Sequence, residues 1–201
     1  MQVMIDHALA FLIAGGIIFT LAGLALRSQN AAIDSTQYYN AKQATHALVE
    51  MIEQDLANIG AGMVEPIGAI ENHTAESFRF RAQIDRGVAG WQVVEYSWEE
   101  LGSVSLADGQ KPTYRVTRYV GGTPTGSSFD GITEFDITLR DHFLVEVTNP
   151  AQYDLVRRID VSVAAVSQLG VAETIEETHW TRAIRPLNLR RLDGGSINII
   201  P

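Results

Sequence analysis

The feature that most constrains the fold of this chain is an apolar run near its N-terminus, residues 8–26, which reads ALAFLIAGGIIFTLAGLAL. The run carries no charge, and Thr20 is its only polar side chain. As a helix that rises about 1.5 Å per residue, it would be roughly 28 Å long, which is close to the ~30 Å hydrocarbon core of a bilayer. The sequence therefore predicts a helix that can span a membrane.

The flanks of the run bear on its fate and orientation. A cleaved signal peptide has a basic start and an apolar core of about 7–15 residues, whereas this chain begins MQVMIDH and continues past Arg27 into helix-compatible sequence. We therefore expect the segment to be retained. Arg27 and Lys42 favour a cytoplasmic C-terminal side, and a cleaved basic leader upstream of Met1 would reverse that preference.

The helix is predicted to continue well beyond the apolar run. No glycine or proline occurs between Arg27 and Gly60, and Gly62 and Pro66 then supply stop signals. A helix over residues 8–59 would be roughly 78 Å long. Spacings of three and four residues place one apolar stripe along its second half, formed by Ala41, Ala44, Leu48, Met51, Ile52, Leu56 and Ile59. This half should pack against a domain.

From Ser77 onward the apolar period changes from helical to alternating, which is typical of half-buried strands. Asp108-Gly109 predicts a turn, and residues 121–131, GGTPTGSSFDG, predict a flexible polar loop or long turn. The expected strands are SFRFRAQI (77–84), WQVVEYSW (91–98), TYRVTRYV (113–120), GITEFDITLRD (131–141), FLVEVT (143–148), LVRRIDVSVAAVS (155–167) and HWTRAI (179–184).

Six or seven strands after one long helix, without strand–helix alternation, predict an α+β fold with an antiparallel sheet on the helix's second half. The expected division is a membrane or filament-core helix at 1–27, its amphipathic continuation at 28–62, and a β-rich head with a C-terminal extension at 63–201.

Composition argues against several function classes. A net charge of −9 leaves little to neutralise phosphates, so we expect no nucleic-acid binding. The chain has no cysteine, which excludes disulfides, thiolate zinc sites and cysteine nucleophiles. The polar loop at 121–131 lacks the lysine and the helix of a phosphate-binding loop.

No pattern points to catalysis, a cofactor or a metal. The five histidines are scattered, and His142 beside Asp141 is more simply a solvated turn than an acid–base or metal pair. An acidic cluster before the last strand is more simply a solvated loop than a cation site; it consists of Glu173, Glu176 and Glu177. Asn72-His73-Thr74 matches a glycosylation acceptor, so Asn72 is a possible glycan site. We therefore expect that the protein is not an enzyme and binds neither a cofactor nor a metal.

The order of segments resembles that of type IV pilins and of the pseudopilins of type II secretion. It is most similar to the larger minor pilins and minor pseudopilins in the run LVEMIEQDLANIGAGM, YRVTRYV, GITEFDITLRD, LVRRIDVSVAAVS and HWTRAIRPLNL. The resemblance implies a pilin-like fold and a structural subunit of an extracellular filament that polymerises through its apolar helix. It also implies a processed, often N-methylated first residue.

The resemblance further implies which residues serve assembly: Met1, Asp6, Phe11, Gly15, Gly16, Phe19 and Gly23. In the family an acidic residue near the processed end pairs with a neighbour's terminal amine. Asp6 stands in for the family's usual glutamate and would pair with the amine of Met1; the alternative is an aspartate that stays among the headgroups. The family's helix-breaking proline is missing, and Gly15-Gly16 offers another soft point.

The implied partners are further copies of the chain, other pilins or pseudopilins, and the assembly motor and platform proteins. The implied location is the inner membrane before assembly and an extracellular filament or periplasmic pseudopilus afterwards. One alternative function is a minor pseudopilin that caps or primes a secretion pseudopilus. Another, from a different class, is a singly anchored exported enzyme or ligand-binding domain.

Overall fold

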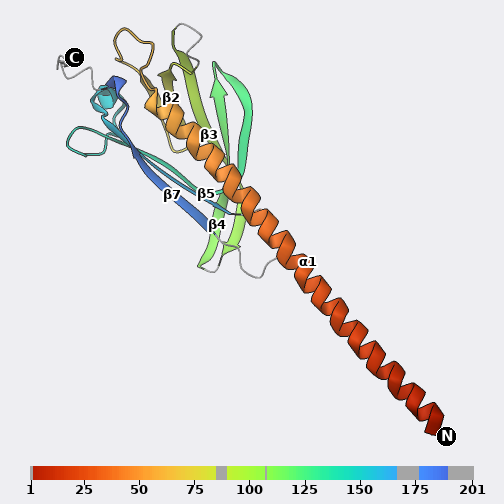
Figure 1. Cartoon of the computed structure of the whole chain (residues 1–201). Helices are drawn as coiled ribbons and strands as arrows, with labels where there is room; N and C mark the ends of the chain where they lie inside the picture. The colour runs from red at the N-terminus through yellow and green to blue at the C-terminus, as the bar shows by residue number, and fades with distance from the viewer. Residues whose placement is uncertain (1, 85–89, 107, 167–176, 190–201) are drawn as a thin grey trace, which may run out of the picture.

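The computed structural model, described here for residues 2–84, 90–106, 108–166 and 177–189, is an α+β fold of one long helix and one antiparallel sheet (Figure 1). The seven strands follow one another in the sheet in chain order, each pairing with the next. Their bounds are β1 Ile70–His73, β2 Ser77–Ala82, β3 Gln92–Leu106, β4 Gly109–Val120, β5 Thr123–Arg140, β6 Arg158–Val166 and β7 Glu177–Ile184, with a short 3-10 helix, η1 Pro150–Leu155, between β5 and β6.

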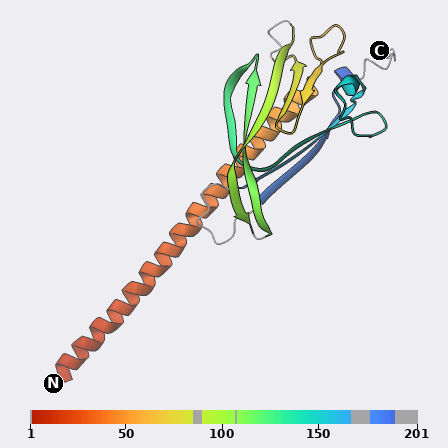
Figure 2. The same ribbon diagram turned by 180° about the vertical axis from the view of Figure 1, so that it is seen from behind.

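Helix α1 spans Gln2–Ala57, which at 1.5 Å per residue makes it roughly 84 Å long. Its N-terminal half extends away from the sheet, and its C-terminal half lies on one face of the sheet, in front of it in Figure 1 and behind it in Figure 2. We call the sheet and its loops the head.

The helix ends two residues before the predicted Ile59 because the chain turns there into the sheet. Ile59 forms a β-bridge with Ala82, and the Gly60 amide donates to the Arg81 carbonyl at 2.8 Å. Gly60 has a φ of +75°, a left-handed conformation that glycine adopts without a Cβ clash. Sheet hydrogen bonds thus replace the next helical ones.

The core lies between the C-terminal half of α1 and the inner face of the sheet. Leu48, Ile52 and Leu56 are fully buried, as are Phe78 and Phe80 of β2. The predicted stripe of the helix therefore faces the head at these positions. The strand candidates at 77–84, 91–98, 113–120, 131–141, 155–167 and 179–184 each overlap a strand.

The prediction of a strand at 143–148 is wrong. Only Glu146 forms an isolated bridge, with Arg140, and residues 141–147 form a tight loop. The Asp141 carboxylate accepts hydrogen bonds from the amides of Phe143 and Val145, at 2.8 and 2.9 Å. Such local side-chain bonds satisfy backbone donors that a strand would have paired with its neighbour.

The prediction of a loop at 121–131 is also wrong. Only Gly121 and Gly122 form the turn, with φ of +60° and +81°, and β5 begins directly after them. Val120 pairs with Thr123, so this is a two-residue hairpin whose turn requires positive φ at both positions. The polar residues that follow belong to the ladder, because pairing with β4 overrides their weak strand propensity. The four-residue strand β1 was not predicted.

Candidate functional site

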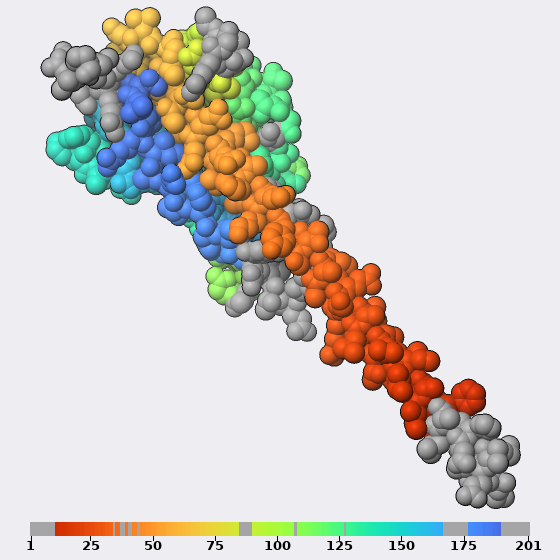
Figure 3. Space-filling view, viewed as in Figure 1, coloured from red at the N-terminus to blue at the C-terminus, as the bar shows by residue number. Residues whose placement is uncertain are grey.

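The most exposed apolar surface of the described chain is the stretch of α1 that extends beyond the head, Phe11–Ile33, which we call the projecting segment. Its mean hydropathy is 1.8 and none of it is buried. Phe11 and Phe19 are 79% and 81% exposed. By length and composition this helix can cross a membrane. The space-filling view shows it standing clear of the head (Figure 3).

Five of the predicted assembly residues lie in this segment: Phe11, Gly15, Gly16, Phe19 and Gly23. Phe11, Gly15, Phe19 and Gly23 follow one another at spacings of four, so large and small residues alternate along one stripe of the helix. Apart from the adjacent helix backbone, a Cβ added at Gly15, Gly16 or Gly23 would meet no described atom within 4 Å. The stripe therefore presents aromatic side chains that alternate with glycines, a surface on which another helix can pack closely.

Of the other two predicted assembly residues, Asp6 is described only in its backbone and Met1 is not described. Asp6 lies on α1, before the projecting segment, but its side chain is outside the described part of the structure. Met1 lies outside the described residues. The pairing of these two residues therefore stays a prediction.

The projecting segment continues without a break into the part of α1 that packs against the head. Three large apolar residues of the stripe on α1 are fully buried: Leu48, Ile52 and Leu56. Truncating one such side chain to alanine typically costs about 2–5 kcal/mol, because a cavity is left behind. The head is thus held to the helix by several contacts of that size.

A buried polar cluster, Asp55, Tyr96 and Arg118, joins the same helix to the sheet, and we call it the clamp. Asp55 is 3% exposed and Arg118 is 9% exposed. The Arg118 guanidinium donates from Nε to Asp55 Oδ2 at 2.6 Å and from its terminal NH2 group to Oδ1 at 3.0 Å. The Tyr96 hydroxyl also donates to Oδ2, at 2.6 Å. One carboxylate of α1 therefore receives three charge-assisted or short bonds from the sheet.

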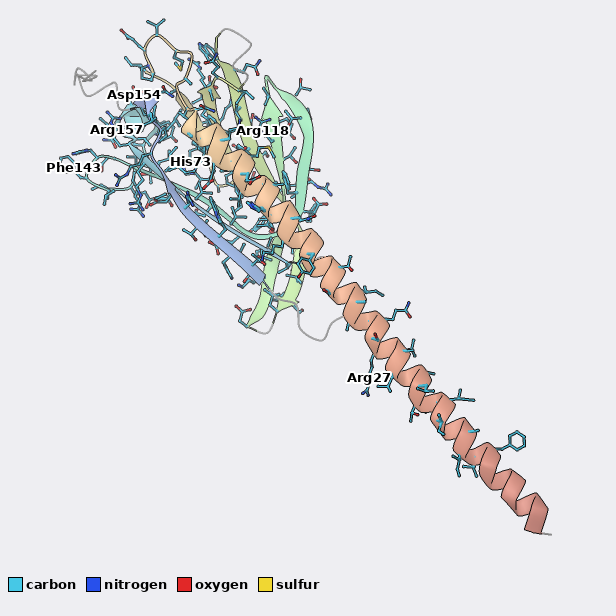
Figure 4. All side chains as sticks on the ribbon, viewed as in Figure 1. Arg27, His73, Arg118, Phe143, Asp154 and Arg157 are labelled. Atoms are coloured by element: carbon cyan, nitrogen blue, oxygen red, sulfur yellow. The ribbon has the colours of Figure 1, made fainter. Side chains whose placement is uncertain are left out.

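The clamp follows from strand register. Tyr96 of β3 and Arg118 of β4 are directly opposite each other, so both side chains leave the same face of the sheet toward α1. Figure 4 labels Arg118 beside the C-terminal half of the helix. Because the three residues come from α1, β3 and β4, the clamp forms only when the head is docked on the helix in one register.

The surroundings of the clamp favour the charged form of Arg118 and the protonated form of the Tyr96 phenol. Burial and the neighbouring Asp55 carboxylate raise the pKa of Tyr96 well above 10, so its hydroxyl remains a donor. Burial lowers the pKa of Arg118, but the hydrogen bonds and charge of Asp55 outweigh burial and leave that pKa raised. The Tyr96 hydroxyl and the Arg118 guanidinium therefore both keep their protons more strongly than the free groups do.

Sequence reasoning missed the clamp although a signal was present. Asp55 lies three residues after Ile52 and directly before Leu56, so it occupies the apolar stripe itself. A carboxylate at a stripe position must find a partner or lose its charge, since burying it unpaired costs several kcal/mol. Residues near Asp55 in the sequence do not reveal that its partner is Arg118, which lies 63 positions away.

The prediction of a solvated loop at Glu177 is wrong, because Glu177 lies in β7 and its side chain is only 11% exposed. It accepts hydrogen bonds from Lys111 Nζ at 2.6 Å and from the Thr133 hydroxyl, and His179 Nε2 lies 2.9 Å from its Oε2. Burial raises the pKa of Glu177, yet these bonds outweigh it and leave the pKa lowered. Glu173 and Glu176 lie outside the described residues.

The remaining candidates lie apart from one another. Asn72 is exposed on β1, and His142 lies in an exposed turn beside Asp141. Within the described part of the chain, no group of three or more His, Asp or Glu side chains could hold a metal ion. No protein-family model matches the chain, and no curated protein matches it.

Proposed function

We propose that this protein is a structural subunit of an extracellular pilus-like filament, with a pilin-like fold, which polymerises through its projecting segment. The observation that carries the proposal is one continuous helix whose apolar first part lies outside the head while its second part is locked into it. We also propose the partners that the resemblance implies, namely further copies of the chain, with the inner membrane holding each subunit before assembly.

The exposed apolar surface requires a partner. Burying a fully exposed Leu, Ile or Phe side chain gains about 1.5–3 kcal/mol, and the projecting segment carries a row of such residues. Lipid and neighbouring helices both satisfy this demand, so the same segment serves an anchored subunit and then an assembled one. The alternation of Phe11, Gly15, Phe19 and Gly23 favours close helix packing over lipid contact alone.

The clamp favours a filament over a simple tether. A tethered domain needs only a flexible connection between its anchor and its head. Here Asp55, Tyr96 and Arg118 fix the head to the helix in one orientation. A regular polymer needs that constancy, because every head must repeat the same contacts with its neighbours.

Asp6 extends the proposal to the end of the helix. A carboxylate carried into a packed helical core must be paired or protonated. We therefore assign Asp6 as the partner of the Met1 amine of an adjacent copy.

Electron microscopy of material sheared from the producing cells, with mass spectrometry of the N-terminus of this chain, tests the proposal. The expected result is regular filaments that contain the chain with a methylated Met1. A chain shortened to begin at Asn30 is the control, and it should be absent from filaments. A full-length chain that stays in the membrane fraction would contradict the proposal and favour a minor pseudopilin or a tethered domain.

A further inference from the structure

The last strand of the sheet, β7, has one backbone edge without a partner strand among the residues that the structure describes. The strands follow one another in chain order, so β7 pairs with β6 on one side only. β7 spans Glu177–Ile184, and at about 3.3 Å per residue its free edge is roughly 26 Å long. The amide and carbonyl groups on such an edge are a template for pairing with a further strand.

The side chains of β7 show that this edge is open to solvent. Val161 and Val163 of β6 are 1% and 0% exposed. Their partners across the ladder are Arg182, whose side chain is 62% exposed, and Trp180, which is only partly buried. Figure 3 shows β7 at the surface, beside the C-terminal half of α1. The inner face of the sheet is therefore incompletely covered along β7.

The C-terminal segment of the same chain, residues 190–201, lies outside the described residues and contains a sequence that is typical of a strand. Residues 193–195, Asp-Gly-Gly, are a turn signal, and residues 196–200, SINII, follow directly. Ile197 and Ile199 alternate with polar neighbours, which is the period of a strand with one apolar face. Isoleucine is also β-branched and therefore favours extended backbone.

Chain connectivity holds this segment close to β7. Leu189, at the end of the described chain, is 2% exposed and belongs to the same hydrophobic core as Ile184, the last residue of β7. The six residues 190–195 that follow can span roughly 20 Å when extended. A segment that turns back within this reach runs antiparallel to β7.

The topology of the sheet favours the same arrangement. Each strand from β1 to β7 is adjacent and antiparallel to the strand that follows it in the chain. Elements that are consecutive in sequence commonly pair in this way, because the connection between them is short. A strand after β7 that pairs with β7 continues this pattern.

The two faces of the segment match the two sides of β7. Trp180 lies on the inner face and packs partly against the core. With Ile197 and Ile199 on that face, apolar side chains cover the remaining exposed surface of the indole, which the hydrophobic effect favours. Asn198 then lies on the outer face, as does the exposed Thr181. The opposite parity would leave both isoleucines in water.

We propose that residues 196–200 form a further strand, antiparallel to β7, along this free edge. The strand comes from the same chain, because the short connection gives it a high effective concentration at the edge. The inference concerns the head alone and does not depend on filament assembly. A covered edge also prevents two heads from pairing edge to edge.

Hydrogen exchange of the full chain in detergent, measured by mass spectrometry on peptides from β7, tests the added strand. A strand with one neighbour bonds only about half of its amides to that neighbour, and a second neighbour protects the others. Ile197→Asp combined with Ile199→Asp places charges on the inner face and should release the segment. We expect the β7 amides that do not bond to β6 to exchange at least tenfold faster in this variant than in the native chain.

Leu192→Asp, which adds a charge before the turn signal, is the control and should leave the exchange of β7 unchanged. Peptides from β6 should exchange equally in the native chain and both variants, which would show that the head stays folded. Equal exchange of β7 in the native chain and the double variant would overturn the inference.

Cross-linking decides which copy supplies the strand, and the absence of native cysteine leaves only introduced thiols to react. Thr181→Cys and Asn198→Cys are placed in one full-length chain, and a short bis-maleimide is added. We expect a monomer that carries one linker and no free thiol. Ser105→Cys, exposed on the β3–β4 hairpin, replaces Thr181→Cys in the control and should give no such bridge.

The same thiols placed in separate copies complete the test. Chains that carry only Thr181→Cys are mixed with chains that carry only Asn198→Cys, and we expect no linked dimer. A dimer would show that a second copy supplies the strand, and it would overturn the proposal. The absence of any bridge in the chain that carries both cysteines would overturn it as well.

Discussion

Removing one member of the clamp should destabilise the head far more than removing an exposed ion pair. Asp55→Asn keeps the shape of the side chain but leaves the guanidinium of Arg118, only 9% exposed, without a counter-charge. Breaking a buried pair in this way typically costs about 3–5 kcal/mol, a large share of the roughly 5–15 kcal/mol by which a domain is stable.

Tyr96→Phe should destabilise the head less than Asp55→Asn does. The ring stays in the core, and Asp55 keeps both bonds from Arg118. The variant loses one hydrogen bond to a charged acceptor, which is worth about 1.5–3 kcal/mol.

Replacing the whole clamp by apolar residues should reverse most of the loss. In the triple variant Asp55→Leu, Tyr96→Phe, Arg118→Met no charge is left uncompensated, and such replacements are often neutral or stabilising by about 1–4 kcal/mol. The triple variant should therefore be more stable than Asp55→Asn. This ordering separates the cost of an orphaned charge from the worth of the ion pair.

Urea unfolding of the full chain in detergent, followed by tryptophan fluorescence, measures these differences. Trp98 is a suitable reporter because it is buried against Phe135, with ring centroids 4.9 Å apart. Arg115→Met, which breaks an exposed pair with Asp130, is the control and should leave the midpoint unchanged. The reasoning fails if Asp55→Asn costs no more than this control, or if the triple variant is as unstable as Asp55→Asn.

Three further predictions concern pH, backbone conformation and assembly. Burial lowers the pKa of His73 below its usual 6.5, so the unfolded chain binds this proton more readily than the folded chain, and the free energy of unfolding should fall as the pH drops below 6.5. His73→Gln should make the urea midpoint less dependent on pH between about pH 7 and 5. His46→Gln, at an exposed histidine, is the control. Gly62→Ala should lower the free energy of unfolding more than Gly68→Ala. Both positions have a left-handed φ that costs an alanine energy, but only at 62 does a Cβ come within 2.9 Å of a backbone oxygen. Equal urea midpoints would contradict this. Asp6→Ala should reduce filament yield at least tenfold while Asp6→Glu preserves it, and a normal yield from Asp6→Ala would refute the pairing with Met1.

Much of the fold was predictable because its signals are local. The helix and six of the seven described strands were predicted from the apolar period, which depends only on residues a few positions apart. The failures lie where one local signal competed with another. Residues 143–148 have the composition of a strand, but Asp141 satisfies their amides locally. The polar run after Gly122 has the composition of a loop, but pairing with β4 makes it a strand.

The candidate site divides in the same way. The projecting segment was predictable, since membrane length and apolarity are properties of consecutive residues. The clamp was not predictable, because Asp55 and Arg118 are 63 positions apart and meet only when α1 packs on the face of the sheet from which Arg118 projects. Likewise, nothing in the sequence of residues 141–147 says that Phe143 stays exposed on the head.

The sequence by itself therefore determined that this chain has a long apolar helix that continues into a β-rich head. Only the tertiary structure decided which strands lie beneath the helix, which charge meets Asp55, and which apolar side chains remain in water. Period and composition act between neighbours along the chain, whereas the partner of a buried carboxylate and the exposure of a loop depend on strand register and helix docking, which bring distant residues together.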